Sequence, residues 1–60
     1  FRRSLYFVKD MKPGDIIGPE HIRSVRPGYG MAPKLRDSLI GKTVLKVITA
    51  NTPVRSELFE

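Results

Sequence analysis

The chain has 60 residues, a formal net charge of +5 and no cysteine. A domain of this size buries only about 60% of the surface of its unfolded chain, and without thiols neither disulfides nor a thiolate metal site can stabilise it. The single histidine, His21, argues against a metal site built from imidazoles. No apolar run approaches the roughly 20 residues of a membrane span. The basic residues are dispersed, with only Arg2 and Arg3 adjacent, so they predict neither a nucleic-acid nor a membrane partner.

The first part of the chain predicts short strands separated by tight turns. Residues 4–8 are aromatic and β-branched in character and predict a strand. Residues 12–15, with the order Lys-Pro-Gly-Asp, predict a turn in which glycine takes the positive-φ position. A short strand is expected at residues 16–17, a single helical turn from Pro19, and extended structure again at residues 23–26.

A loop rich in glycine and proline follows, from Val25 to about Pro33. Pro27 fixes φ, and Gly28 and Gly30 permit positive φ, so a tight irregular loop is predicted. Arg26 stands where a strand would enter this loop. A guanidinium presented by a stiff loop can meet a carboxylate, phosphate or carbonyl with little ordering cost.

The rest of the chain predicts further short elements. Residues 34–40 predict one or two helical turns with an apolar face, closed by Gly41 as the residue after the cap. Residues 43–48 alternate enough to predict a strand. The predicted apolar face of the turns consists of Leu35, Leu39 and Ile40, and the inward residues of the strand are either Val44 and Ile48 or Leu45 and Val47.

A weak internal repeat runs through the sequence. A shift of 37 residues places residues 11–22 on residues 48–59, so that Gly14 meets Asn51 and Glu20 meets Glu57. Glycine and asparagine are the two residue types best suited to left-handed backbone. The alternatives are two pseudo-twofold copies around a shared core, or chance similarity between two turn-rich segments.

No catalytic constellation is visible. The six acidic residues are dispersed, and no pair has a spacing that suggests acid–base catalysis or metal binding. Asp10 and Asp15 flank the Pro-Gly turn and are expected to hydrogen-bond to it. Glu20 and Glu57 fall early in expected helical turns, where the helix dipole favours a negative charge.

Several of these segments resemble, in order and spacing, the C-terminal SAF (antifreeze-like) domain of the sialic acid synthase family, over nearly the whole chain. Within that family the sequence motifs are most similar to those of bacterial pseudaminic acid synthases; the N-acetylneuraminate, legionaminate and spore-coat polysaccharide synthases are alternatives. The segments that carry the resemblance are residues 3–6 (RSLY), 9–15 (KDMKPGD), 22–30 (IRSVRPGYG), 33–34 (PK) and 39–42 (LIGK).

The resemblance implies a mostly β fold of the β-clip type, as in type III antifreeze proteins, with internal pseudo-twofold symmetry. Residues 1–60 would form one SAF domain of a larger synthase whose N-terminal TIM barrel is absent here. That parent condenses phosphoenolpyruvate with an N-acylated amino sugar, with a divalent metal (Mn or Mg) in the barrel. The isolated domain is expected to hold no cofactor and no catalytic residue, and the parent is expected in the cytoplasm.

The resemblance also implies a partner and a set of contacts. In the family the SAF domain covers the TIM barrel of the partner subunit in a homodimer, and the arginine of the Arg-Pro-Gly motif contacts the N-acyl group of the sugar. That residue is Arg26 here, and Tyr29 and Lys34 lie on the same loop as further expected contacts. The other readings are an SAF-type protein-binding module of a flagellar or pilus assembly chaperone, and an ice-binding antifreeze-like domain.

Overall fold

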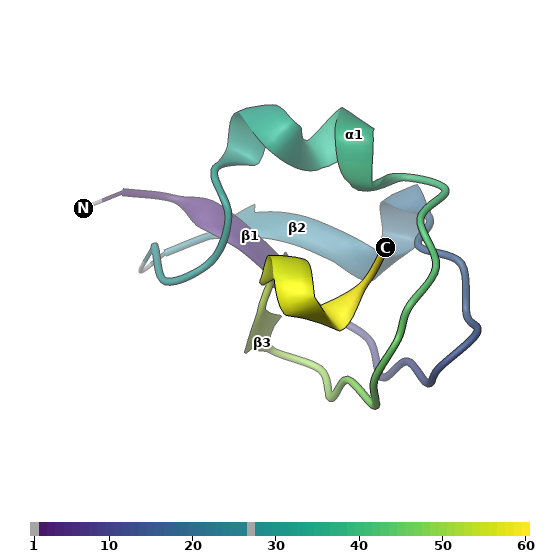
Figure 1. Cartoon of the computed structure of the whole chain (residues 1–60). Coiled ribbons are helices and arrows are strands. Elements are labelled where there is room, and N and C mark those ends of the chain that lie inside the picture. Colours follow the sequence, from purple (N-terminus) through teal and green to yellow (C-terminus); the bar gives the residue numbers. More distant parts are fainter. Residues whose placement is uncertain (1, 27) are drawn as a thin grey trace.

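The computed structural model describes residues 2–26 and 28–60. The elements are short throughout, as the frequent turn signals in the sequence predicted (Figure 1). In chain order they are β1 (Ser4–Phe7), the 3-10 turn η1 (Pro19–His21), β2 (Ile22–Val25), the 3-10 turn η2 (Pro33–Leu35), α1 (Arg36–Leu39), β3 (Thr52–Pro53) and the 3-10 turn η3 (Ser56–Leu58).

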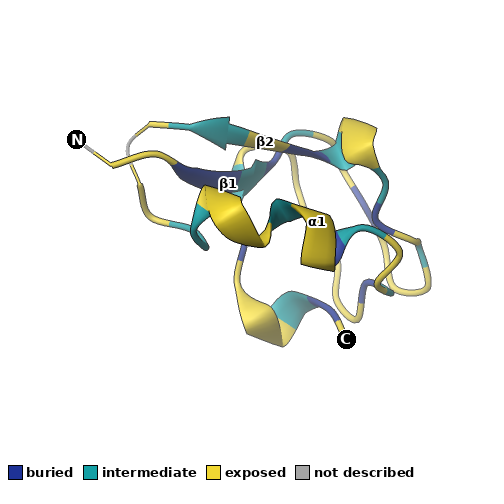
Figure 2. Cartoon of the chain, turned by 90° about the horizontal axis from the view of Figure 1, so that it is seen from above, coloured by how far each residue is buried: buried dark blue, intermediate teal, exposed yellow. Residues whose placement is uncertain are grey.

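The three strands form one antiparallel sheet in the order β2-β1-β3. Ser4 pairs with Val25 at one end of the β1–β2 ladder and Phe7 with Ile22 at the other. Because β1 lies between two neighbours and is covered on both faces, its residues do not alternate cleanly between buried and exposed. In Figure 2 this strand is drawn next to β2 and largely in the colour of buried residues.

A small aliphatic and aromatic core holds these elements together. The side chains come from β1, β2 and α1 and from the irregular segments between the elements, so no single element supplies the core. Its buried members are Leu5, Phe7, Met11, Ile17, Ile22, Leu39, Val44, Ile48, Val54 and Phe59.

Three turns carry residues in the left-handed region: Gly14 at φ +95°, Gly41 at φ +92° and Asn51 at φ +72°. The predicted 12–15 turn is confirmed: the Asp15 amide donates to the Lys12 carbonyl, and the Lys12 amide donates to Asp15 Oδ2. Gly41 also occupies its expected place, because α1 has Ile40 as its C-cap.

The expectation for Asp10 was only half right. Its carboxylate does accept a backbone hydrogen bond, but the donor is the amide of Ala50, at 2.7 Å. Asp10 therefore ties its own turn to a segment 40 residues away, and this long-range contact is not visible from local spacing.

The strand predicted over residues 43–48 is wrong, and so is the one at residues 16–17. These residues make only isolated bridges, Ile16 with Thr43, Val44 with Phe59 and Met11 with Ile48. Each bridge joins a different neighbour, so the chain bends between them and no continuous ladder forms. Two pairs of residues were predicted as alternatives for the inward face of this segment. Val44 and Ile48 are the buried pair, and Leu45 and Val47 are exposed.

The apolar face predicted for residues 34–40 holds only in part. Leu39 is buried and Ile40 packs against the core, but Leu35 is 36% exposed. Leu35 ends the 3-10 turn η2, and α1 begins at the next residue. A 3-10 turn has three residues per turn rather than 3.6, so Leu35 does not lie on the line of the α-helical face.

The internal repeat is confirmed by the hydrogen bonds. Met11 and Ile48 exchange both backbone hydrogen bonds at 2.8 Å, so they face each other across the pseudo-twofold axis. Away from the axis the bonds occur in matched pairs: the Gly14 amide donates to the carbonyl of Val44, and the Asn51 amide to that of Phe7. The 3-10 turns η1 and η3 also match under the shift of 37 residues.

Candidate functional site

The loop predicted to carry the site leaves the sheet at the end of β2. Arg26 follows the last residue of that strand, and the loop continues to η2 at Pro33. Pro27, which was expected to fix φ in this loop, lies outside the described residues. The loop therefore begins beside the Ser4–Val25 pair, at one end of the β1–β2 ladder.

Three hydrogen bonds attach the far side of this loop to the sheet. The Gly30 amide donates to Ser4 Oγ at 2.8 Å, and Ser4 is buried with 2% of its surface exposed. The Leu5 amide donates to the Met31 carbonyl at 2.8 Å, and the Met31 amide donates to the Val54 carbonyl at 3.0 Å. Each bond crosses between segments distant in sequence, so Gly30 and Met31 are fixed by both β1 and the segment after β3.

Close approach explains the two glycines of the loop. A Cβ on Gly30 would overlap the carbonyl oxygen of Leu5 and come within 2.9 Å of the Val54 nitrogen. A Cβ on Gly28 would lie 2.7 Å from the carbonyl oxygen of Arg2. The expected use of positive φ is not found at Gly30; glycine stands there because backbone lies where a side chain would go.

The three expected contact residues all point away from the core. Arg26 and Lys34 are exposed, and Tyr29 is 70% exposed, so its ring does not cover the core. No hydrogen bond or ion pair joins these three side chains to one another or to any other described residue. All three side chains therefore present hydrogen-bond donors to solvent that no described residue occupies.

Arg2 and Arg3 stood out in the sequence only as adjacent basic residues, and their position near Arg26 was not predicted. Because β1 and β2 are antiparallel, Arg3 and Arg26 both lie just beyond the Ser4–Val25 pair. Arg3 Nη1 donates to the Ser24 carbonyl at 3.0 Å, which holds its side chain along β2. The signal for this clustering was the pair of predicted strands at residues 4–8 and 23–26: antiparallel pairing of the two would have placed Arg3 and Arg26 at the same end.

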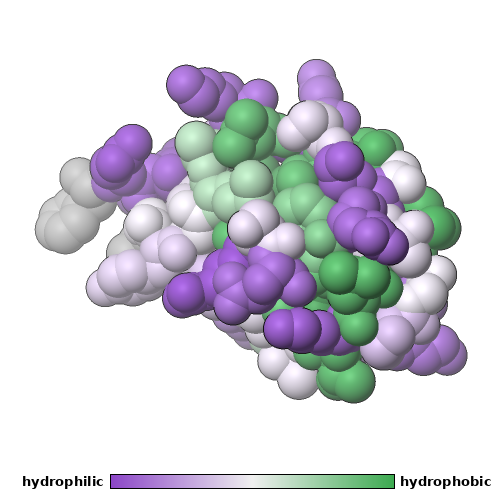
Figure 3. Space-filling view, in the orientation of Figure 1, coloured by the Kyte–Doolittle hydropathy of each residue, from purple (hydrophilic) through white to green (hydrophobic). Residues whose placement is uncertain are grey.

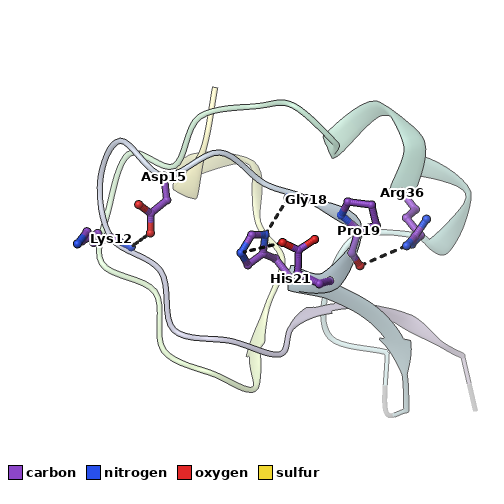
Figure 4. A network of polar contacts seen from close by, with 7 residues as sticks. Lys12, Asp15, Gly18, Pro19, His21 and Arg36 are labelled. Atoms are coloured by element: carbon purple, nitrogen blue, oxygen red, sulfur yellow. Dashed lines mark hydrogen bonds and ion pairs between the residues drawn. The ribbon is translucent and has the colours of Figure 1, made fainter.

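A separate polar network surrounds η1, and it is structural (Figure 4). The Gly18 amide donates to Nδ1 of His21 at 2.8 Å, so the ring closes the turn at its N-terminal end. Arg36 donates to the Pro19 carbonyl at 3.3 Å and links this turn to α1. His21 thus acts as a hydrogen-bond partner for the backbone of its own turn.

The described residues contain neither a cluster of metal-ligating side chains nor a membrane-spanning helix. Within residues 2–26 and 28–60, no group of three or more His, Cys, Asp and Glu side chains could hold a metal ion. Over the same residues, no helix has the length and apolar character needed to cross a bilayer.

Known proteins similar to this chain agree with the resemblance seen in the motifs. The chain is 48% identical over 48 residues to the pseudaminic acid synthase of Campylobacter jejuni subsp. jejuni serotype O:23/36, a match that covers 80% of this chain and 14% of the relative. It is 33% identical over 60 residues to the pseudaminic acid synthase of Helicobacter pylori, with 100% of this chain and 18% of the relative covered. The chain therefore spans less than a fifth of the length of these relatives.

A solved structure supports the fold. The solution structure of an antifreeze protein like domain in human N-acetylneuraminic acid phosphate synthase matches with a TM-score of 0.88, over 95% of this chain and 73% of that chain, at 21% sequence identity. The expected mostly β, antifreeze-like architecture is therefore confirmed. The SAF domain family matches residues 2–60, and the chain belongs to that family.

Proposed function

We propose that this chain is the SAF domain of a nonulosonic acid synthase of the pseudaminic acid type. The parent would condense phosphoenolpyruvate with an N-acylated amino sugar. The relatives that carry the name pseudaminic acid synthase support this assignment over the chaperone and ice-binding alternatives. We also propose that the parent works in the cytoplasm, where phosphoenolpyruvate would be supplied.

In this proposal the domain covers the mouth of the TIM barrel of the partner subunit in a homodimer. A barrel active site opens at its loop-bearing face, and a rigid cover there excludes water and adds contacts to the non-reacting end of the substrate. The proposal places the Mn²⁺ or Mg²⁺ of the reaction in the barrel.

The observation that carries the proposal is the setting of Arg26. Its side chain is exposed and has no partner among the described residues, and it stands between β2 and a loop whose far side is attached by three hydrogen bonds. The guanidinium is therefore free to bind a ligand, and the attached loop needs less ordering when the ligand arrives. The planar fork of guanidinium donors suits the carbonyl oxygen of an N-acyl group. Tyr29, exposed on the same loop, and Lys34, exposed in η2 just after it, would contact the same sugar.

Steady-state kinetics of the full-length parent test this role. Arg26→Ala should raise the KM for the amino sugar about 10- to 150-fold, as expected for a lost hydrogen bond to a charged group worth about 1.5–3 kcal/mol, and leave the KM for phosphoenolpyruvate nearly unchanged. Arg23→Ala, which removes an exposed arginine from the middle of β2, is the matched control and should be silent. An unchanged sugar KM in the Arg26 variant would contradict the contact.

A second test separates the domain from the parent. The purified 60-residue chain should show no synthase activity, because the proposal places every reacting group in the barrel. Turnover of phosphoenolpyruvate and amino sugar by the chain alone would overturn that division of labour. Failure of the full-length parent to use any N-acylated amino sugar would overturn the synthase assignment itself.

A further inference from the structure

A hollow of about 420 Å³ lies beside the Arg26 loop, at the end of the sheet where β1 begins. Its position follows from the register, since Ser4 is the first residue of β1 and the loop passes directly over it. The wall on one side is loop backbone and on the other side is the start of the chain. The lining residues are Arg2, Arg3, Ser4, Gly28, Gly30, Ala32 and Pro33.

The charged residues that line this hollow are all basic. Two arginines line it, no acidic residue does, and Arg26 stands at the same end of the ladder. The described ion pairs are elsewhere: His21 with Glu20, and Arg36 with Asp37. In Figure 3, hydrophilic side chains lie beside the N-terminal end of the molecule, and others are spread over the rest of this face. Among the described residues, none forms an ion pair with the arginines of the hollow.

The two arginines of the lining differ in how they are held. Arg3 uses Nη1 to reach the Ser24 carbonyl, which orients its guanidinium and leaves its other donors available. Arg2 is exposed and makes no hydrogen bond or ion pair with any residue that the structure describes. The Arg2 carbonyl lies close to the loop, since a Cβ on Gly28 would come within 2.7 Å of its oxygen. One oriented and one free guanidinium at the edge of a preformed hollow are typical of a site for an oxyanion.

We propose that this hollow binds the oxyanion group, carboxylate or phosphate, of a small molecule. Arg2 and Arg3 supply charge-assisted hydrogen bonds, and Gly28 and Gly30 leave the backbone wall free of side chains that would fill the space. The site is distinct from the N-acyl contact proposed for Arg26, because an N-acyl carbonyl is neutral and needs no pair of cations. It stands or falls independently of the synthase assignment.

The test is a titration of the ¹⁵N-labelled chain with inorganic phosphate, at constant ionic strength set with sodium chloride. Saturable shifts are expected at the Nε–H groups of Arg2 and Arg3 and at the amides of Gly28 and Gly30. The variant Arg2→Gln/Arg3→Gln should raise the Kd at least about tenfold, since a tenfold change corresponds to about 1.4 kcal/mol and each charged hydrogen bond contributes about that much or more. The single variant Arg2→Gln should raise it by a smaller factor without disturbing the Arg3–Ser24 contact.

Lys46→Gln is the control for the single variant Arg2→Gln, because it also removes one charge, and Lys46 is exposed and does not line the hollow. It should change the Kd less than twofold. Equal weakening by Lys46→Gln, or shifts that rise linearly at every basic residue, would show diffuse charge attraction and overturn the site. An unchanged Kd in the double arginine variant would overturn it as well.

The same titration of the full-length parent, followed by calorimetry, separates two sources of the oxyanion. A Kd close to that of the chain would support a small-molecule ligand. Binding to the chain but not to the parent would show that an acidic side chain of the parent already fills the hollow, and would overturn the small-molecule proposal.

Discussion

Residues 4–23 and 41–60 share one hydrogen-bond pattern, and they differ most at their first position. In the first copy this position is Ser4, a buried residue of β1 whose hydroxyl accepts from Gly30. In the second copy it is Gly41, which has φ +92° and turns the chain out of α1. The first copy therefore continues as a strand that holds the Arg26 loop, while the second copy begins with a bend.

The cores of the two copies match at most positions, with one exception. Ile17 and Val54 are equivalent, and each is 1% exposed. Leu5, however, is a fully buried core residue, whereas its counterpart Lys42 is exposed. The repeat therefore sets most of the buried positions but not all of them, and the segment between the copies, residues 24–40, carries the loop on which the proposed contacts lie.

The largest expected effect compares the same core position in the two copies. Phe7→Ala should cost about 3–5 kcal/mol of the free energy of unfolding, and Val44→Ala about 2 kcal/mol, because both side chains are fully buried and phenylalanine leaves the larger cavity. Urea denaturation measures both. A domain of this size has a total stability of only about 3–9 kcal/mol, so Phe7→Leu, with an expected loss of about 1–2 kcal/mol, serves if Phe7→Ala does not fold. A greater loss for Val44→Ala than for Phe7→Ala would show that the second copy dominates the core.

The next effect tests the close packing of Gly30 against Leu5 and Val54, which attaches the loop to the first copy. Gly30→Ala should destabilise the chain by about 2–3 kcal/mol, because its Cβ would meet the backbone of Leu5 and Val54 and neither can yield as a flexible side chain would. Tyr29→Ala in the same loop is the control. Its ring is largely exposed, so its effect should stay within about 0.5 kcal/mol. Equal stability of the two variants would mean that the loop is not fixed by close backbone packing.

Much of the fold was predictable because its signals are local. The turn at residues 12–15, the helical turn at Pro19 and the bend at Gly41 each follow from residue types that restrict or free one backbone angle. The repeat was visible for the same reason, since Gly14 and Asn51 are the residue types that adopt left-handed backbone most readily.

The errors came from contacts between distant segments. The alternation in residues 43–48 resembles a strand, yet these residues bridge to partners near both ends of the chain and form no ladder. The clustering of Arg3 with Arg26 depends on the β1–β2 register, and the role of Gly30 depends on the approach of Leu5 and Val54. Sequence spacing alone contains none of these distances.

The smallest expected effect asks whether the turns of the two copies are interchangeable. Gly14→Asn and Asn51→Gly should each change the free energy of unfolding by about 0.5 kcal/mol or less, because both residue types tolerate left-handed backbone and a Cβ at Gly14 meets nothing within 4 Å. Gly14→Ala and Asn51→Ala are the controls, and each should lose about 1 kcal/mol to backbone strain alone. Thermal unfolding of the four variants compares them directly. An equal loss of stability in Gly14→Asn and Gly14→Ala would contradict this expectation. The two turns would then share a backbone angle but would not tolerate the same residue types.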